Sequence, residues 1–384
     1  MLDEDQVYFI VWNVFQLLHF KAILHEMPKA NLVIEKRREH YVINDTHLVD
    51  IDNPIIFVDK TKIYETIGLT AKVIVVQTVF EQIYLFKHTK IVMLQYGYAK
   101  ANHNYGLWRV LADLNLVYGN YAKQQITPLS PTQITGCPRY DIWHNEDFYT
   151  QCQQDYAKLI DKTKQTLLYA PSWGDASSVD DYIKEICQLS SGYNVFVKLH
   201  HLWFLQRDEV LDKAYKNVHF FYDDIDILSL LAVADVVLSD YSGAIFDAIY
   251  CQKPIVLLSL SEEKMGKCLE VVGKDSLEIV KRSDLGYIVS QPKELADTVK
   301  KALTLGKVCD DKLYYQLFSE TKTATNNVIN AIENVISTKT SRNLQQLYYR
   351  QKIKRRLYKV AKKRAKNVKN HEKNSNRKTS YPIN

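Results

Sequence analysis

The sequence has 384 residues, more than one hydrophobic core usually spans, so two domains are the default expectation. Apolar residues make up 46% of the chain and charged residues 24%, and this balance excludes a largely disordered or fibrous protein. The net charge of +6 is divided unevenly, because residues 350–378 hold 14 Lys or Arg and one acid, Glu372, and therefore carry +13. The rest of the chain carries the difference, −7, so a mildly acidic globular part precedes a cationic tail.

Six cysteines are scattered along the chain without a C-x-x-C pair, so the sequence indicates neither a zinc ribbon nor a dithiol redox site. Reduced thiols in a cytosolic protein fit this pattern. The chain opens with Asp3, Glu4 and Asp5, unlike the basic start of a signal peptide, and no apolar run approaches the roughly 18 to 20 residues that span a bilayer. We therefore expect a cytoplasmic protein without a membrane-spanning segment.

Short apolar runs rich in β-branched residues alternate with longer segments of helical character, a pattern typical of parallel sheets with crossover helices. A crossover helix is expected over residues 15–27, which include His19. These elements predict one Rossmann-like lobe over residues 1–145. Its strands are expected at 8–12, 31–34, 55–58, 72–76, 91–94 and 114–118.

A polar segment of helical character follows Pro138, and a second series of apolar runs predicts another lobe over residues 146–335. Two such lobes facing each other place the carboxyl ends of both sheets around one cleft, where open α/β sheets bind ligands. The predicted fold class is therefore α/β, with two Rossmann-like lobes facing a cleft. The strands of the second lobe are expected at 166–169, 195–198, 218–221, 236–238 and 255–258.

Residues 336–384 are predicted to form a basic amphipathic C-terminal helix, with a disordered tail beyond Asn370. This helix has three interpretations: it binds an anionic membrane surface, it binds nucleic acid, or its charges form a solvated face.

The membrane interpretation is favoured for residues 344–378, because each Lys or Arg near anionic lipid gains about 1 kcal/mol. Tyr348, Tyr349, Leu357 and Tyr358 add side chains suited to the membrane interface. Nucleic acid is not an expected partner, because no base-reading fold accompanies the tail. We therefore expect a peripheral protein at the inner face of the cell membrane.

The stretch from Leu238 to Asp247, L-S-D-Y-S-G-A-I-F-D, puts a polar turn between an apolar strand and a helix. Backbone N–H groups in such a turn and at a helix start point outward and suit a diphosphate. Ser242 adds a hydroxyl, and Gly243 allows close approach of an anion. The alternative is structural: Asp240 or Ser242 caps the helix after a buried strand.

This stretch, continued by Lys253-Pro-Ile, resembles the donor-site segment of the CDP-glycerol:poly(glycerophosphate) glycerophosphotransferase family, the teichoic-acid and capsule polymerases. Three further segments resemble family motifs in the same order. Residues 136–141, G-C-P-R-Y-D, match G-x-P-R-x-D; residues 169–173, Y-A-P-S-W, match Y-A-P-T; and residues 198–200 match K-L-H. The resemblance spans residues 95–258.

The resemblance implies a GT-B architecture, with the acceptor in the first lobe and the nucleotide donor in the second. It implies transfer of glycerol phosphate or ribitol phosphate from CDP-glycerol or CDP-ribitol to a polymer on a lipid-linked acceptor. The acceptor hydroxyl would attack the β-phosphorus, and CMP would leave. No D-x-D pair, P-loop or G-x-S-x-G elbow occurs, so no protein metal site is predicted, while Mg²⁺ on the diphosphate stays compatible with the sequence.

His200 is the main catalytic candidate, because it follows a strand at the expected cleft and a histidine with its ordinary pKa can exchange a proton near neutral pH. A lone histidine is otherwise more often structural. Arg139 and Asp141 share a turn, which is equally compatible with a salt-bridged hinge. The candidate donor-binding residues are Lys198, Arg139, Ser172, Asp240, Ser242, Gly243 and Asp247.

One segment departs from the family pattern. Where the family has W-H-G, with the histidine as a proposed base, this chain has Gln95-Tyr96-Gly97. A tyrosine with an ordinary pKa of about 10 is a poor base at neutral pH. Either Tyr96 positions the acceptor while another residue takes the proton, or the donor differs. His103 is close enough in sequence to substitute, or is a loop histidine, and Asp113 is a weaker candidate.

Two other hypotheses stay open. A GT-B glycosyltransferase that uses a nucleotide sugar in surface polysaccharide synthesis would keep the fold, and the presence of Tyr96 favours it. A catalytically inactive GT-B scaffold would dock a polymer-assembly complex through its basic tail. The presence of His200, Ser242 and Asp247 together argues against this scaffold.

Overall fold

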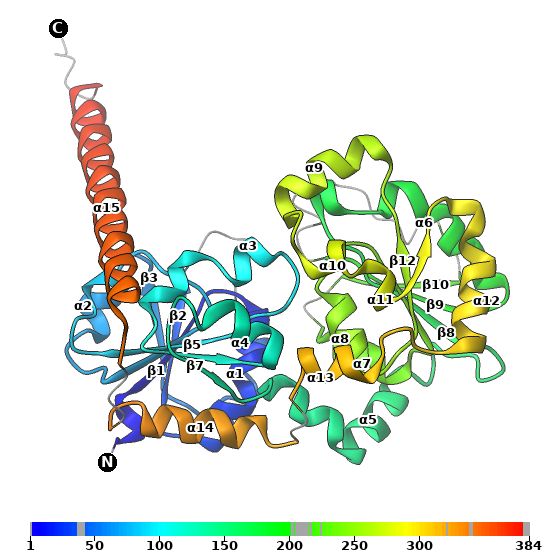
Figure 1. The fold of residues 1–384 in the computed structure, drawn as a ribbon, viewed down its shortest axis with the longest axis horizontal. Helices are drawn as coiled ribbons and strands as arrows, with labels where there is room; N and C mark the ends of the chain where they lie inside the picture. Colours follow the sequence, from blue (N-terminus) through cyan, green and yellow to red (C-terminus); the bar gives the residue numbers. More distant parts are fainter. Residues whose placement is uncertain are drawn as a thin grey trace, which may run out of the picture.

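The structure is a computed structural model that describes residues 2–36, 43–200, 203, 215, 217–222, 225–319, 322–337 and 341–378, the last with side chains through Arg364. Two parallel sheets lie side by side, each flanked by helices (Figure 1). The predicted α/β fold class with two Rossmann-like lobes is therefore confirmed.

The first lobe is built on a seven-stranded parallel sheet with the order β3-β2-β1-β4-β5-β6-β7. Its interior strand β1 is buried at every residue, as expected for a strand covered by helices on both faces. The strand order reverses between β1 and β4, the position at which such sheets open to ligands. The strands are β1 (Val7–Val11), β2 (Asn31–Lys36), β3 (Ile55–Asp59), β4 (Val73–Val76), β5 (Lys90–Leu94), β6 (Leu114–Val117) and β7 (Thr132–Ile134).

The second lobe repeats this plan with six parallel strands in the order β10-β9-β8-β11-β12-β13. Its reversal lies between β8 and β11, so the loops after these two strands are placed to meet a ligand. The strands are β8 (Thr166–Tyr169), β9 (Asn194–Lys198), β10 (Val218–Phe221), β11 (Val236–Ser239), β12 (Ile255–Leu258) and β13 (Tyr287–Val289).

Helices cover the faces of both sheets (Figure 1). The helix after β1 begins at a capped end, because the Asn13 side chain accepts a hydrogen bond from the Gln16 N–H at 2.8 Å. The helices before β8 are α1 (Val14–Glu26), α2 (Ile63–Ile67), α3 (Ala101–Asn104), α4 (Asn120–Ile126) and α5 (Glu146–Tyr156), with 3-10 helices η5 (Leu107–Leu111) and η6 (Pro138–His144). The later ones are α6 (Val179–Gln188), α7 (Ile227–Val233), α8 (Ala244–Tyr250), α9 (Glu262–Val272), α10 (Leu277–Val280), α11 (Arg282–Leu285), α12 (Leu295–Leu305), α13 (Asp311–Leu317), α14 (Ala324–Asn334) and α15 (Leu344–Lys378).

An aromatic cluster joins the two lobes. The ring of Tyr98, after β5, lies 5.5 Å from the ring of Phe246 on α8 and 5.5 Å from that of Phe318, after α13. Tyr140 of η6 stacks on Tyr250 of α8 with ring centroids 3.9 Å apart. Aromatic pairs at such spacings contribute about 0.5 to 1.5 kcal/mol beyond their buried area. The cluster therefore fixes how the lobes meet.

Helix α14 belongs to the first lobe, in contrast to the predicted boundary of the second lobe at residue 335. Its buried side chains Val328 and Ile332 pack in the same apolar cluster as Phe9 and Phe20. The sequence analysis did not predict this helix, and the structure shows that its apolar face is covered by the first lobe. The chain therefore crosses to the second lobe and returns.

Helix α15 leaves the first lobe and projects away from it (Figure 1). The predicted basic C-terminal helix is thus present, but it continues through Lys378, beyond the predicted onset of disorder at Asn370. Residues 379–384 lie outside the described part of the chain.

Candidate active site

A cleft of about 780 Å³ lies between the lobes. Its first-lobe side includes residues that follow β1, β4 and β5, among them Trp12, Gln77 and Tyr96. Its second-lobe side includes residues that follow β8 and β11, among them Pro171 and Ser242. The carboxyl ends of both sheets therefore open onto one space, where open α/β sheets bind ligands.

The last residue of β9 and the segment that follows it contribute two of the expected residues to this cleft. Lys198 and His200 both line it, and Lys198 is only 7% exposed. The His200 ring lies 5.8 Å from the ring of Trp173, which also lines the cleft. A cation on a largely buried stem beside an imidazole is suited to contact phosphate oxygens.

The turn after β11 contributes Ser242, Gly243 and Asp247, which all line the cleft. The Ser242 hydroxyl accepts a hydrogen bond from the Ala244 N–H at 3.3 Å, while the N-cap residue of α8 is Gly243, so no side chain caps this helix. A Cβ atom placed on Gly243 would meet nothing within 4 Å. The backbone at this turn is therefore open to close approach by a ligand.

Asp240 and Ser172, in contrast, do not line the cleft but lie buried beneath it. The Asp240 carboxylate accepts hydrogen bonds from the backbone N–H groups of Ser172 at 2.7 Å and Ser178 at 2.8 Å, and from the Ser178 hydroxyl at 2.9 Å. Burial raises the pKa of Asp240 although these hydrogen bonds oppose the rise. The structure thus assigns both residues to support the loop after β8, and not to the direct donor contact expected from the sequence.

Arg139 lines the cleft within a buried charge network. Its Nη2 lies 2.5 Å from Asp226 Oδ1, and its Nη1 lies 2.9 Å from Asp247 Oδ1. The Tyr140 hydroxyl also donates to Asp247 Oδ1 at 2.8 Å. The charge of Arg139 lowers the pKa of Asp226, although burial opposes this. Arg139 is therefore held by two carboxylates. Asp226, the cap of α7, was not predicted as a site residue.

Asp141 has a different role from its neighbour. Its two carboxylate oxygens accept hydrogen bonds from the Ala324 N–H at 3.0 Å and the Thr325 N–H at 2.7 Å, at the start of α14. The hinge interpretation of this turn is therefore supported in a modified form. The turn holds α14 through Asp141, while the salt bridges of Arg139 reach into the second lobe.

On the first-lobe side, Tyr96 lies beside His19 of α1, with ring centroids 5.6 Å apart, and both line the cleft. His19 Nδ1 lies 2.8 Å from the Phe15 carbonyl oxygen, which can only accept, so Nδ1 carries the proton and Nε2 the lone pair. Burial, helped by the Arg139 charge, lowers the pKa of His19 to about 4. A neutral imidazole therefore stands where the sequence predicted only a helix residue.

His103 of α3 also lines the cleft, and burial together with the nearby Lys100 charge lowers its pKa. The Lys100 N–H donates to Glu278 Oε1 at 2.6 Å, and the Ala101 N–H donates to Ser276 Oγ at 2.8 Å. Burial raises the pKa of Glu278 to about 7. These bonds tie α3 to the second lobe at the rim of the cleft, a contact that the sequence did not predict.

The wall of the cleft farthest from the second lobe comes from α15. Ile353, Arg356, Leu357 and Val360 line the cleft together with Trp108 of η5. From the sequence, a membrane surface was favoured for this helix over nucleic acid or a solvated face, and no contact with the cleft was predicted. This helix reaches the cleft because it packs on the first lobe, and no local sequence pattern predicts that packing.

Two wider properties can be stated for the residues that the structure describes. Within them, no three His, Cys, Asp or Glu side chains are grouped so that they could hold a metal ion. In the same part of the chain, no helix combines the length and the apolar character needed to cross a membrane.

Two doubly wound parallel lobes with a shared cleft define a GT-B type of protein, the class expected from the sequence. The family model described as CDP-Glycerol:Poly(glycerophosphate) glycerophosphotransferase matches residues 128–320, about half of the chain. The protein belongs to this family.

Individual relatives agree with this assignment. The teichoic acid poly(glycerol phosphate) polymerase of Bacillus spizizenii (strain ATCC 23059 / NRRL B-14472 / W23) is 28% identical over 133 residues, which cover 32% of this chain and 33% of that protein. The match thus spans about a third of the length of this curated relative.

Solved structures share the fold. The wall teichoic acid polymerase TagF superposes with a TM-score of 0.63 at 14% identity, covering 87% of this chain and 90% of that chain. A TagF variant soaked with CDPG gives a TM-score of 0.64 at 14% identity, with coverage of 88% and 90%. The UDP-GlcNAc 2-epimerase from Neisseria meningitidis, bound to UDP-GlcNAc, gives 0.55 at 12% identity, with coverage of 86% and 100%.

Proposed function

We propose that the protein is a CDP-alditol phosphotransferase. It would move glycerol phosphate or ribitol phosphate from CDP-glycerol or CDP-ribitol to a growing teichoic-acid-like or capsular polymer on a lipid-linked acceptor, and release CMP. The main support is that separate stretches of the family match meet in one cleft: Arg139, Lys198, His200, Ser242 and Asp247 all line it. The names of the relatives suggest the donor and the polymer.

The proposed reaction divides the work between the lobes. Lys198 and the turn at Ser242 and Gly243 would hold the donor diphosphate on the second-lobe side. The acceptor hydroxyl would enter from the first-lobe side, beside Tyr96. Its oxygen forms a new bond to the β-phosphorus as the anhydride bond to CMP breaks, and His200 takes the hydroxyl proton. The fixed charge of Lys198 stabilises negative charge that develops during transfer.

A magnesium ion would enter this site with the donor. Asp247 is the one carboxylate among the described residues that line the cleft, and it accepts hydrogen bonds from Arg139 and Tyr140. Phosphate oxygens and water would therefore supply most ligands of such an ion.

The test is CMP release with CDP-glycerol and with CDP-ribitol, each with a range of polymer primers. His200→Ala should abolish transfer without changing the thermal unfolding temperature. His25→Ala is the matched control, because this histidine lies on exposed α1 surface and should keep full activity. Absence of CMP with both donors and all primers would reject the proposal.

The same assay separates the alternatives that the sequence left open. Release of UDP or GDP from a nucleotide sugar would indicate hexosyl transfer, the glycosyltransferase hypothesis. Binding to a polymer-assembly complex without turnover of any nucleotide donor would indicate the inactive scaffold.

The proposal includes attachment to the inner face of the cell membrane through α15. Exposed Lys359, Lys362 and Lys363 would contact anionic lipid, and Tyr348 and Tyr358, 61% and 54% exposed, would sit at the interface. Replacing the three lysines with Glu should release the protein from phosphatidylglycerol vesicles, as should high salt. Vesicle binding that persists under both conditions would contradict electrostatic attachment.

A further inference from the structure

The first half of α15 is fixed to the first lobe by ion pairs. Arg342, just before the helix, and Arg350 lie 3.2 Å and 3.0 Å from the buried Asp113 carboxylate. Farther along, Arg364 lies 2.8 Å from Glu81. The two pairs at Asp113 are buried and costly to break, because a lone charge would be left inside the protein, whereas the Arg364 side chain is 62% exposed. The beginning of the helix, through Arg350, is therefore a fixed part of the first lobe.

The same half of the helix turns one stripe toward the cleft. Ile353, Arg356, Leu357 and Val360 are spaced by three and four residues, so they share one helix face, and all four line the cleft. Ile353 and Leu357 also pack on the apolar core of the first lobe. The stripe is thus an apolar wall that carries one guanidinium group.

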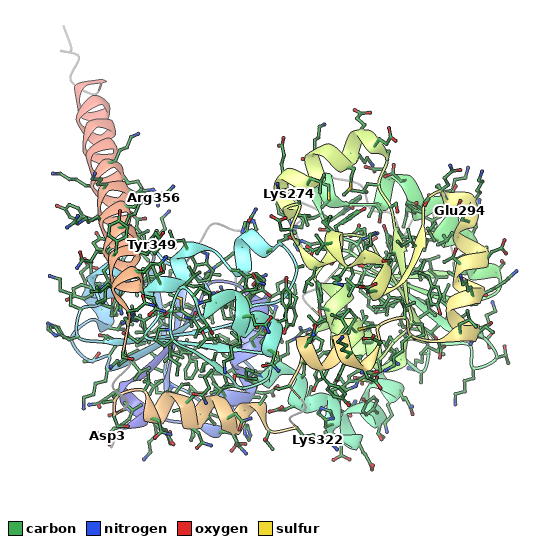
Figure 2. All side chains as sticks on the ribbon, in the orientation of Figure 1. Asp3, Lys274, Glu294, Lys322, Tyr349 and Arg356 are labelled. Atoms are coloured by element: carbon green, nitrogen blue, oxygen red, sulfur yellow. The ribbon has the colours of Figure 1, made fainter. Side chains whose placement is uncertain are left out.

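Arg356 differs from the arginines that hold the helix. Arg342, Arg350 and Arg364 pair with carboxylates, whereas within the described residues Arg356 has no carboxylate partner. Figure 2 shows Arg356 on the part of α15 beside the first lobe. An exposed guanidinium at the wall of a cleft is a fork of N–H donors that fits two oxygens of a phosphate group.

The shape of the cleft bears on the length of the ligand that it can hold. Helix α15 and the second lobe lie on opposite sides of the first lobe (Figure 1), yet both contribute to one cleft. The cleft therefore continues across the carboxyl edge of the first sheet, beyond the place proposed for the nucleotide donor. A small acceptor would not need this extension, but a chain would.

We propose that the α15 wall is a subsite for the growing end of a polyanionic acceptor, a chain of polyol units joined by phosphodiesters. Arg356 binds a phosphodiester one or more units behind the reacting hydroxyl. Trp108, Leu357 and Val360 contact the C–H faces of the polyol between phosphates. In such a chain, charged phosphodiesters alternate with carbon-rich polyol units. The α15 wall matches this alternation, because it presents one guanidinium group between apolar side chains. This inference rests on the proposed function and adds the place where the acceptor chain binds, with Arg356 as the residue that contacts its phosphodiester.

The test is equilibrium binding of a water-soluble tri(glycerol phosphate), measured by calorimetry at low salt without a nucleotide. Arg356→Gln should weaken binding about tenfold, the effect expected for loss of a charge-assisted hydrogen-bonded pair. Arg355→Gln is the matched control: it removes the same charge from the adjacent exposed residue, which does not line the cleft, and should change affinity less than twofold.

Equal weakening by both substitutions would show that only the overall charge of the helix matters, and would overturn the subsite. No weakening by Arg356→Gln, or no binding by the unaltered protein, would overturn it as well. CMP release from CDP-glycerol is measured separately. Binding that depends on Arg356 without any CMP release would reject the proposed reaction and leave the subsite standing, so the two failures are distinguishable.

Discussion

Acidification should destabilise the protein through His19. The folded state holds this imidazole neutral, with its pKa lowered from 6.5 to about 4 mainly by burial. The unfolded chain takes up a proton below about pH 6.5, whereas the folded chain does not until about pH 4, so stability falls as the pH drops through this window. Between pH 7.5 and 5.0 the loss from this one group is about 2 kcal/mol, at 1.36 kcal/mol per pKa unit.

The assay is urea unfolding at both pH values. His19→Gln removes the titrating group, so its loss of stability on acidification should be smaller than that of the unaltered protein by about 2 kcal/mol. His25→Gln is the control, since the His25 side chain is 79% exposed and should leave the pH dependence unchanged. An identical pH dependence for His19→Gln and the unaltered protein would refute the reasoning, as would an NMR titration that finds the His19 ring protonated at pH 6.

Two further substitutions test the packing around the site. Arg139→Ala leaves its two carboxylate partners without a counter-charge and should cost about 3 to 5 kcal/mol in urea unfolding; a cost below 1 kcal/mol would mean that solvent already compensates these charges. Gly119→Ala would place a Cβ atom 2.3 Å from the Leu317 carbonyl oxygen and should destabilise by about 1 to 3 kcal/mol. Gly192→Ala, where a Cβ atom meets nothing within 4 Å, should be nearly neutral in urea unfolding, and equal effects of the two glycine substitutions would contradict this account.

The strands that carry long apolar runs could be predicted from the sequence, because a buried parallel strand has a recognisable composition. Strands β7 and β13 were not predicted, since each is an edge strand of three residues, which is too short to show a periodic pattern. Helix α14 was not predicted either, and the sequence does not indicate which lobe covers it. That choice depends on where the chain returns after Phe318.

The candidate site also contains residues that the sequence could predict and residues that it could not. Motif segments that end strands indicated Lys198, His200, Ser242 and Asp247, because strand ends meet at the cleft in any doubly wound fold. Asp240 follows its strand just as a ligand-binding residue would, and only the structure reveals its buried N–H partners. His19 and the α15 stripe reach the cleft through tertiary packing, which no local pattern encodes.

The return of α14 to the first lobe has a consequence for biosynthesis. Strand β7 ends at Ile134 and α14 begins at Ala324, so about 190 residues, including the whole second sheet, are synthesised before the apolar face of the first lobe that α14 covers is buried. At about 5 to 20 residues per second, the ribosome needs roughly 10 to 40 seconds for this stretch. During that interval the nascent first lobe presents the surface that Val328 and Ile332 later occupy, a target for a chaperone.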